Sequence, residues 1–239
     1  MRILVFQHIP VEHPGIIRDF LAEDGIPWDA VELDAGDHIP DLDGYDALVV
    51  MGGPMDVWDE DEHPWLVAEK AAIREAVTDR GMPFLGTCLG HQLLADALGG
   101  RVAPMEAPEV GILEVELTAD GKADPLFKGI SPVSKCLQWH GSEIVEAPPG
   151  ARILARSPAC RVQAFRFGEK AYGLQYHVEM TATTITDWGE IQAYQESLEK
   201  ILGPGALGGL DAEAKRHMDV FARDARRLYD NFKCLLIDP

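Results

Sequence analysis

A cysteine between two glycines is the feature of this sequence with the clearest chemical meaning. Cys88 lies in the stretch FLGTCLGHQLL, residues 84–94, where an apolar strand is expected to turn into a helix. A side chain at such a tight turn points outward at the top of the sheet, and the helix N-terminus favours a thiolate. The pattern predicts a nucleophile elbow with Cys in place of Ser, rather than an inert buried cysteine, which is the more common fate of this residue type.

A nucleophilic thiolate needs a base, and the base needs a group that fixes its tautomer. Of the eight histidines, His177 is the best candidate, because it follows the strand-like run 172–176 and Glu179 lies two residues further on. Residues two apart on an extended segment share a face, so Glu179 can hold one ring nitrogen of His177 while the other faces Cys88. A solvated polar pair would show the same spacing, and the residues alone leave both interpretations open.

Acyl transfer to a thiol also needs N–H donors that hold the oxyanion. The N–H of Leu89, directly after the nucleophile, is one natural donor. Gly53 is the second candidate, because it follows a buried strand expected at residues 46–51 and has no side chain to keep a substrate from the backbone. Taken alone, Gly52-Gly53-Pro54 is more simply explained as a turn.

No metal or cofactor site is expected. His177 and Glu179 match the beginning of the zinc-deaminase signature, which requires Pro-Cys-x-x-Cys further along. Only Cys234 follows Glu179, so the signature is incomplete. The four cysteines have no short metal-type spacing, and a chain of this size and apolar content does not need disulfides, so we expect free thiols in a reducing compartment.

The charge of the chain limits its partners. Lys and Arg number 21 against 40 Asp and Glu, which gives a formal net charge of −19 over 239 residues. Such a surface repels nucleic acid and anionic membranes, so neither is expected as a partner, and its simplest consequence is solubility. The short apolar run at residues 3–6 predicts neither a signal peptide nor a membrane span, so a cytoplasmic location is expected.

Hydrophobic periodicity predicts an α/β fold. In the first half we expect strands at residues 3–6, 30–33, 46–51 and 83–85, and helices at 15–25, 66–80 and 89–98. The alternation indicates a three-layer αβα arrangement around a doubly wound, mostly parallel, flavodoxin-like sheet, with sites at the carboxyl ends of the strands.

The second half predicts additions to the same sheet rather than a second domain. Added antiparallel strands are expected at 113–117, 136–139, 152–155, 162–167 and 171–176. Residues 183–202 are expected to be helical, the glycines at 203–209 to form a connector, and Asp211 to cap a final helix. The chain is thus expected to form one domain, 1–239, with a C-terminal helical extension from about residue 183.

Together these motifs make the chain resemble the class I glutamine amidotransferase family. The match is carried by Gly52-Gly53-Pro54, the elbow around Cys88, and Gln175-Tyr176-His177-Val178-Glu179, which occur in the family's order. The resemblance extends from the first strand to about residue 181. It implies a Cys-His-Glu triad in which Cys88 attacks the carboxamide of glutamine and forms a γ-glutamyl thioester. His177 would move the proton, and Glu179 would orient His177.

The resemblance also implies binding roles. The N–H groups of Gly53 and Leu89 would hold the oxyanion, and His140 would line or support the pocket without acting as the base. The substrate-binding residues that it implies are Gly52, Gln92, Val110 and Gly111.

Two departures from the family pattern bear on function. Val178 stands where the family usually has Pro between the His and the Glu. About 60 residues follow Glu179, which is too few for the synthetase domain that would use the ammonia. The chain therefore resembles stand-alone members that are similar to the amidotransferase domain of GMP synthetase.

Three functions remain open on the sequence. The first is a glutaminase-type hydrolase or transferase that acts on a γ-glutamyl amide, either glutamine or another small γ-glutamyl compound. The second is an ammonia-supplying subunit of a two-chain synthetase, whose partner would be the synthetase chain. The third is a catalytically idle interaction protein that keeps the elbow only as architecture, and it ranks last because all three triad positions are filled.

Overall fold

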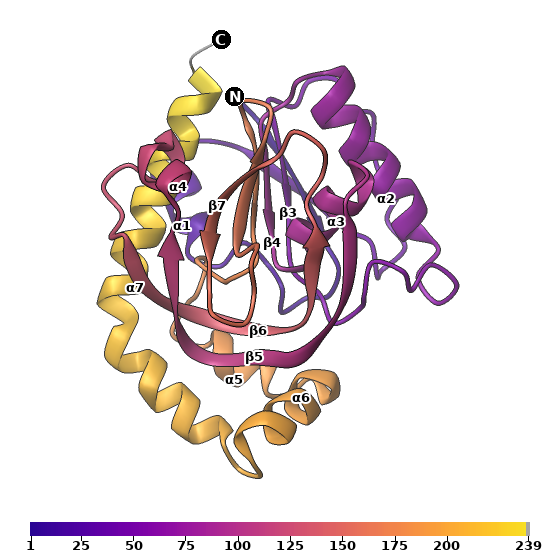
Figure 1. Ribbon diagram of the computed structural model, residues 1–239. Coiled ribbons are helices and arrows are strands. Elements are labelled where there is room, and N and C mark those ends of the chain that lie inside the picture. Colours follow the sequence, from indigo (N-terminus) through magenta and orange to yellow (C-terminus); the bar gives the residue numbers. More distant parts are fainter. Residues whose placement is uncertain (238–239) are drawn as a thin grey trace.

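One nine-stranded sheet forms the centre of the computed structural model, which describes residues 1–237 (Figure 1). Its strands are β1 (Ile3–Gln7), β2 (Trp28–Glu32), β3 (Ala47–Val50), β4 (Phe84–Thr87), β5 (Arg101–Leu117), β6 (Val133–Glu146), β7 (Arg152–Arg156), β8 (Ala164–Phe167) and β9 (Ala171–Leu174). They lie in the order β2-β1-β3-β4-β9-β8-β7-β5-β6. The first five in that order pair in parallel, and the remaining neighbours pair antiparallel. The expected α/β fold with added antiparallel strands is confirmed, but residues 171–176 were wrongly expected among the added strands. Their strand β9 lies between β4 and β8 and pairs in parallel with β4, so it completes the parallel part of the sheet.

Helices cover both faces of the parallel strands. The helices are α1 (Ile17–Glu23), α2 (Trp65–Arg74), α3 (Leu89–Ala97), α4 (Ala119–Ala123), α5 (Thr184–Trp188), α6 (Gln192–Leu202) and α7 (Leu207–Ile237). A π-helical turn, Glu75–Asp79, continues α2, and a short 3-10 helix spans Pro125–Phe127. In Figure 1, α2 and α3 lie on one side of the sheet and α1 and α7 on the other.

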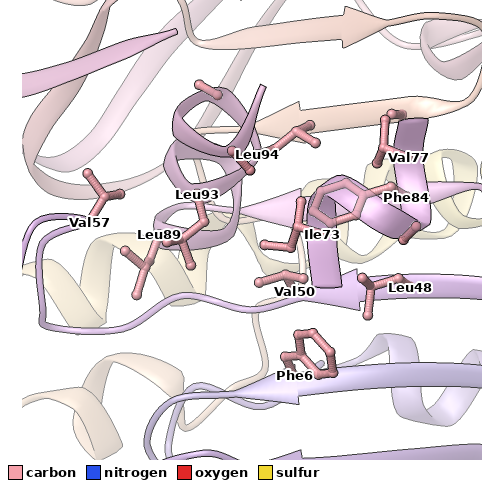
Figure 2. Packing of buried hydrophobic residues seen from close by; sticks show 14 of the residues in the cluster. Phe6, Leu48, Val50, Val57, Ile73, Val77, Phe84, Leu89, Leu93 and Leu94 are labelled. Carbon is pink, nitrogen blue, oxygen red and sulfur yellow. The ribbon is translucent and has the colours of Figure 1, made fainter. Parts of the chain in front are cut away.

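Each central apolar strand contributes buried side chains to both faces of the sheet. Leu4 and Phe6 of β1 belong to the buried cluster under α2 and α3, whereas Ile3 and Val5 belong to the cluster under α1 and α7. This alternation explains why the central strands are continuously hydrophobic in sequence. Figure 2 shows the first cluster, in which the labelled side chains are Phe6, Leu48, Val50, Val57, Ile73, Val77, Phe84, Leu89, Leu93 and Leu94.

The antiparallel part is larger than the sequence predicts. β5 and β6 have 17 and 14 residues, against expected strands of five and four residues. They pair along most of their length and curve above α5 and α6 (Figure 1). The pairing is irregular between Pro104 and Glu109, and prolines at a strand irregularity hide a strand from sequence patterns because they normally argue against one.

The C-terminal helices also correct the expectation. Residues 183–202 form two helices, α5 and α6, instead of one. Asp211 is not a cap, because α7 already begins at Leu207 and Asp211 pairs with Lys215 one turn on. Gly208 and Gly209 lie within this helix rather than in a connector. The apolar face of α7 packs in a third buried cluster with α5, α6, β5 and β6, and this packing outweighs the low helix propensity of glycine.

No helix in the described part of the chain is both long enough and apolar enough to cross a membrane. The division of the chain into one domain with an extension stays a prediction.

Strand β4 and helix α3 approach each other very closely at the turn that joins them. A Cβ atom on Gly86 would lie 2.4 Å from the carbonyl oxygen of Gly90, and one on Gly90 would lie 2.2 Å from the carbonyl oxygen of Val50. No side chain fits at either position, which explains the two glycines that flank the cysteine.

We expect Gly90→Ala to lower the free energy of unfolding by about 1–3 kcal/mol, because the added methyl group must push α3 away from β3. Gly209→Ala is the matched control, since nothing lies within 4 Å of the Cβ that it would add. Urea unfolding followed by circular dichroism measures both variants. Equal stability of Gly90→Ala and the wild type would contradict the close approach.

Candidate active site

Cys88 occupies the turn between β4 and α3. Its backbone has φ 52° and ψ −106°, and it is the only residue other than glycine with a positive φ in the described part of the chain. Its N–H donates to the carbonyl oxygen of Leu174 at 2.8 Å, which ties the turn to the end of β9. The side chain lines a pocket of ≈ 370 Å³. This geometry is that of the predicted nucleophile elbow.

His177 and Glu179 follow β9 and lie together. The N–H of His177 donates to the carbonyl oxygen of Leu137 at 3.0 Å, which fixes this segment against β6. Nδ1 of His177 lies 2.7 Å from Oε1 of Glu179, and the N–H of Val178 donates to the other oxygen of Glu179 at 2.9 Å. The ring of Trp188 meets the imidazole edge-on, with centroids 4.5 Å apart. The imidazole is therefore held in one orientation, with Val178 accommodated where proline was expected.

The surroundings of His177 favour its protonated form. Burial opposes the charge, but the ionised Glu179 and the nearby Cys88 outweigh burial and raise the pKa of His177 well above its ordinary value. Nε2 of His177 is buried and has no hydrogen-bond partner in the described structure. A buried, unpartnered nitrogen beside a thiol can receive the thiol proton and give it up again.

The pocket collects most of the predicted site residues. Gly53, Leu89, Gln92 and Val110 line it together with Cys88, whereas Gly52 and Gly111 are not among its lining residues. His140 also lines the pocket, as expected.

Two glutamines form a chain of hydrogen bonds beside the thiol. The side-chain amide of Gln92 donates to the carbonyl oxygen of Ser142 at 3.1 Å and to Oε1 of Gln175 at 3.0 Å. The amide of Gln175 in turn lies 3.7 Å from Sγ of Cys88. Gln92 is thus linked to the thiol through Gln175, which the sequence analysis included in the His177 motif without assigning it a role.

Further buried polar residues near the site were also missed. His8 and Glu12 follow β1, and Glu69 lies on α2. Tyr194 comes from α6, and its hydroxyl donates to Oε1 of Glu12 at 2.6 Å. The one signal that could have indicated His8 and Glu12 was their position after β1, because the carboxyl ends of β1 and β3 meet at the same edge of a parallel sheet.

Glu12 forms a compact cluster with the pair of His177 and Glu179. One ligand atom from each of the three lies within 4.8 Å of the others. Nδ1 of His177 and both oxygens of Glu179 are already engaged in the bonds described above. Burial raises the pKa of Glu12, although His177 and Tyr194 oppose the shift. A raised pKa weakens a carboxyl group as a metal ligand, and most donor atoms of the cluster are already engaged, so the cluster fits a hydrogen-bonded network better than a cation site.

Comparison with known proteins settles the family. The model of the glutamine amidotransferase class-I family matches residues 16–187. The chain belongs to this family. Its members are generally glutamine-hydrolysing.

Relatives and solved structures agree. The chain is 33% identical over 156 residues to a subunit of the glutamine-hydrolyzing GMP synthase of Sulfolobus acidocaldarius, covering 65% of this chain and 78% of the relative. It is 32% identical over 209 residues to the glutamine amidotransferase-like protein YfeJ of Salmonella typhimurium, with 85% of each chain covered. A glutamine amidotransferase from Thermotoga maritima superposes with a TM-score of 0.86 at 31% identity, covering 97% of each chain.

We expect Glu179→Gln to slow the alkylation of Cys88 by iodoacetamide near neutral pH. The charge of Glu179 raises the pKa of His177 and so favours the state in which His177 holds the thiol proton. Without this charge the pKa of His177 falls, and the thiolate forms only at higher pH. A fall of one pKa unit corresponds to about a 10-fold slower reaction near neutral pH.

The measurement is the alkylation rate as a function of pH, followed by mass spectrometry of the Cys88 peptide. Asp219→Asn, which removes an exposed carboxylate from α7, is the matched control. Superimposable profiles for Glu179→Gln and the wild type would contradict the coupling between Glu179 and the thiol.

Proposed function

We propose that this protein hydrolyses the γ-glutamyl amide bond of glutamine or of a small γ-glutamyl compound through a thioester on Cys88. The observation that carries the proposal is the buried His177–Glu179 pair, 2.7 Å between Nδ1 and Oε1, beside a cysteine in the elbow conformation that lines an open pocket. Membership of the class I family supports the same chemistry.

The first half of the proposed reaction forms the thioester. Sγ of Cys88 attacks the side-chain carbonyl carbon of the substrate, and the carbonyl electron pair moves onto oxygen. The N–H groups of Gly53 and Leu89, which flank Cys88 on the pocket wall, stabilise this oxyanion. When the tetrahedral intermediate collapses, the C–N bond breaks, and His177 gives the departing nitrogen a proton from Nε2. Ammonia or an amine leaves.

The second half hydrolyses the thioester. Neutral His177 accepts a proton from water as the water oxygen attacks the same carbon. The C–S bond then breaks, and glutamate leaves. The sulfur departs as a thiolate beside the imidazolium of His177, which restores the starting pair.

The chain builds the outer wall of the pocket from its own C-terminal part. The pocket-lining residues of α6 are Ala193, Tyr194, Ser197, Lys200 and Ile201. Their spacing places them on one face of the helix. This helix lies beyond the segment that the family model matches, and it supports a substrate that is held without a second chain.

We expect Cys88→Ala to abolish hydrolysis, because no other group in the pocket can form the thioester, and a loss of about 10³-fold or more is typical of a missing nucleophile. The assay is the release of ammonia or amine from a panel of glutamine, γ-glutamyl dipeptides and γ-glutamyl alkylamides. A γ-glutamyl adduct on the Cys88 peptide, trapped by rapid acid quenching, identifies the intermediate.

Cys234→Ala is the matched control, since Cys234 is an exposed free thiol far along α7. A normal rate in Cys88→Ala would remove the nucleophile from the proposal. Inactivity of the wild type on the whole panel would contradict hydrolysis by the isolated chain and leave a partner-dependent subunit or a catalytically idle interaction protein.

The names of several relatives favour a second candidate, an ammonia-supplying subunit of a two-chain synthetase. Those relatives are described as subunits of a glutamine-hydrolyzing GMP synthase. This function uses the same triad but depends on a partner, so glutaminase activity of the isolated chain would be low. Co-purification of a synthetase chain, with a glutaminase rate that rises on mixing, would support this candidate, whereas full activity of the lone chain would count against it.

A further inference from the structure

A second buried His–Glu pair lies behind the turn that follows β3. Nδ1 of His8 lies 2.7 Å from the carbonyl oxygen of Gly52, and Nε2 lies 2.9 Å from Oε1 of Glu69. Both side chains are completely buried. The ring of Trp65 stacks on the imidazole, with centroids 5.4 Å apart and an angle of 18° between the planes. The proposed triad does not use this pair. Hydrogen bonds and an aromatic ring contact nevertheless hold His8 in place, as they hold His177.

The partners of His8 determine which of its nitrogens carry hydrogen. A carbonyl oxygen can only accept a hydrogen bond, so Nδ1 must be the donor to Gly52. Burial opposes a charge on His8, but Glu69, the Gly52 carbonyl and Glu12 outweigh burial and raise the pKa of His8. The imidazolium form donates from both nitrogens, so it fits the two oxygen partners of His8.

The oxygen that His8 holds belongs to the same peptide group as the N–H of Gly53. This peptide is trans, and in a planar trans peptide the C=O and N–H bonds point in opposite directions. A donor fixed on the Gly52 oxygen therefore turns the Gly53 N–H away from His8. Gly53 lines the pocket beside Cys88 and Leu89, and within residues 1–237 its N–H makes no hydrogen bond to the protein. Gly53 is half-buried, and an N–H that lines a pocket without a protein partner is available to a ligand.

We propose that His8 and Glu69 are positioning residues of the oxyanion hole. By donating to the Gly52 oxygen, His8 fixes the direction of the Gly53 N–H and polarises the peptide, so that this N–H becomes a stronger donor to the substrate oxygen. Glu69 holds His8 in the orientation and protonation state that this requires. The inference rests on the proposed function, because it assigns Gly53 to the stabilisation of an oxyanion.

Two physical effects make such an arrangement effective. Hydrogen bonds in a chain polarise one another, so a charged donor on the C=O strengthens the N–H of the same peptide. A donor that is already oriented also spends no free energy on reorganisation when negative charge develops on the substrate. The role of His8 is therefore to act through Gly53, with no contact to the substrate.

Two substitutions can test the contacts of the two ring nitrogens of His8 independently. The side-chain amide nitrogen of asparagine lies near the position of Nδ1, so His8→Asn can still donate to Gly52 but cannot reach Glu69. The amide nitrogen of glutamine lies near the position of Nε2, so His8→Gln can reach Glu69 but not Gly52. The two variants have similar polarity, and they differ in the one contact that the proposal requires.

The experiment measures kcat and KM on the γ-glutamyl amide that the wild type hydrolyses fastest, together with the rate of Cys88 alkylation by iodoacetamide. Alkylation displaces iodide and forms no oxyanion, so it reports how the thiol is presented without involving Gly53. We expect His8→Gln to lower kcat about 10²-fold, the typical cost of one oxyanion-hole donor, while KM and the alkylation rate stay within about threefold of wild type. His8→Asn should recover most of the lost kcat.

Two results would overturn the inference while the proposed function stands. The first is a His8→Gln variant with the kcat of the wild type. The second is a loss of kcat matched by an equal loss of alkylation, since this would make His8 a mere support of the elbow. Glu69→Gln adds a check that leaves His8 intact: it keeps an acceptor for Nε2 without the charge, and a kcat equal to wild type would contradict the role of Glu69. A wild type that hydrolyses no γ-glutamyl amide would overturn the proposed function and this inference together.

Discussion

The backbone of Cys88 is held in a conformation that side chains other than glycine rarely adopt, and the rest of the site depends on it. Such a conformation costs of order 1–3 kcal/mol and persists only where the surrounding structure imposes it. Here the constraint is the close approach of β4, α3 and β3, which leaves room for hydrogen alone at Gly86 and Gly90. The apolar layer beneath α2 and α3 holds these elements together (Figure 2), so hydrophobic burial offsets the strain. One turn then exposes the thiol and the first N–H of the helix to the same pocket.

Two buried His–Glu pairs lie near this elbow, and Glu12 interacts with the histidine of each pair. The pair of His177 and Glu179 is local in sequence, whereas His8 and Glu69 are 61 residues apart and meet only through the fold. The pKa of Glu12 is raised by its burial and lowered by both histidines, and the net direction is upward. Glu12 therefore interacts electrostatically with both histidines. Its hydrogen bond with Tyr194 then serves to hold the loop after β1 in place.

How much the sequence predicts follows from the range of the interactions involved. The residues of the proposed triad could be named because each stands in a short motif with its own local geometry. Strands β1, β3 and β4 could be predicted because burial on both faces makes them almost entirely apolar. His8 and Glu69 could not be found, since neither has a local motif and the fold alone brings them together. β5 was predicted too short because prolines interrupt its pattern. Asp211 was wrongly predicted to be a cap because the glycines before it indicated a break in the helix. The packing of Leu210 and Ala214 in the buried cluster instead keeps these glycines within α7.

The C-terminal helices contribute to the site from outside the segment that the family model matches. The family model ends at residue 187, and α6 begins at Gln192. Two residues of α6 nevertheless make hydrogen bonds at the site. The hydroxyl of Tyr194 donates to Glu12 next to the proposed triad. The hydroxyl of Ser197 accepts a hydrogen bond from Nε1 of Trp139 at 2.8 Å on the pocket wall. Among the described residues that line the pocket, Lys200 is the only Lys or Arg and Asp56 is the only Asp or Glu. The pocket wall thus includes a helix from outside the segment that the family model matches.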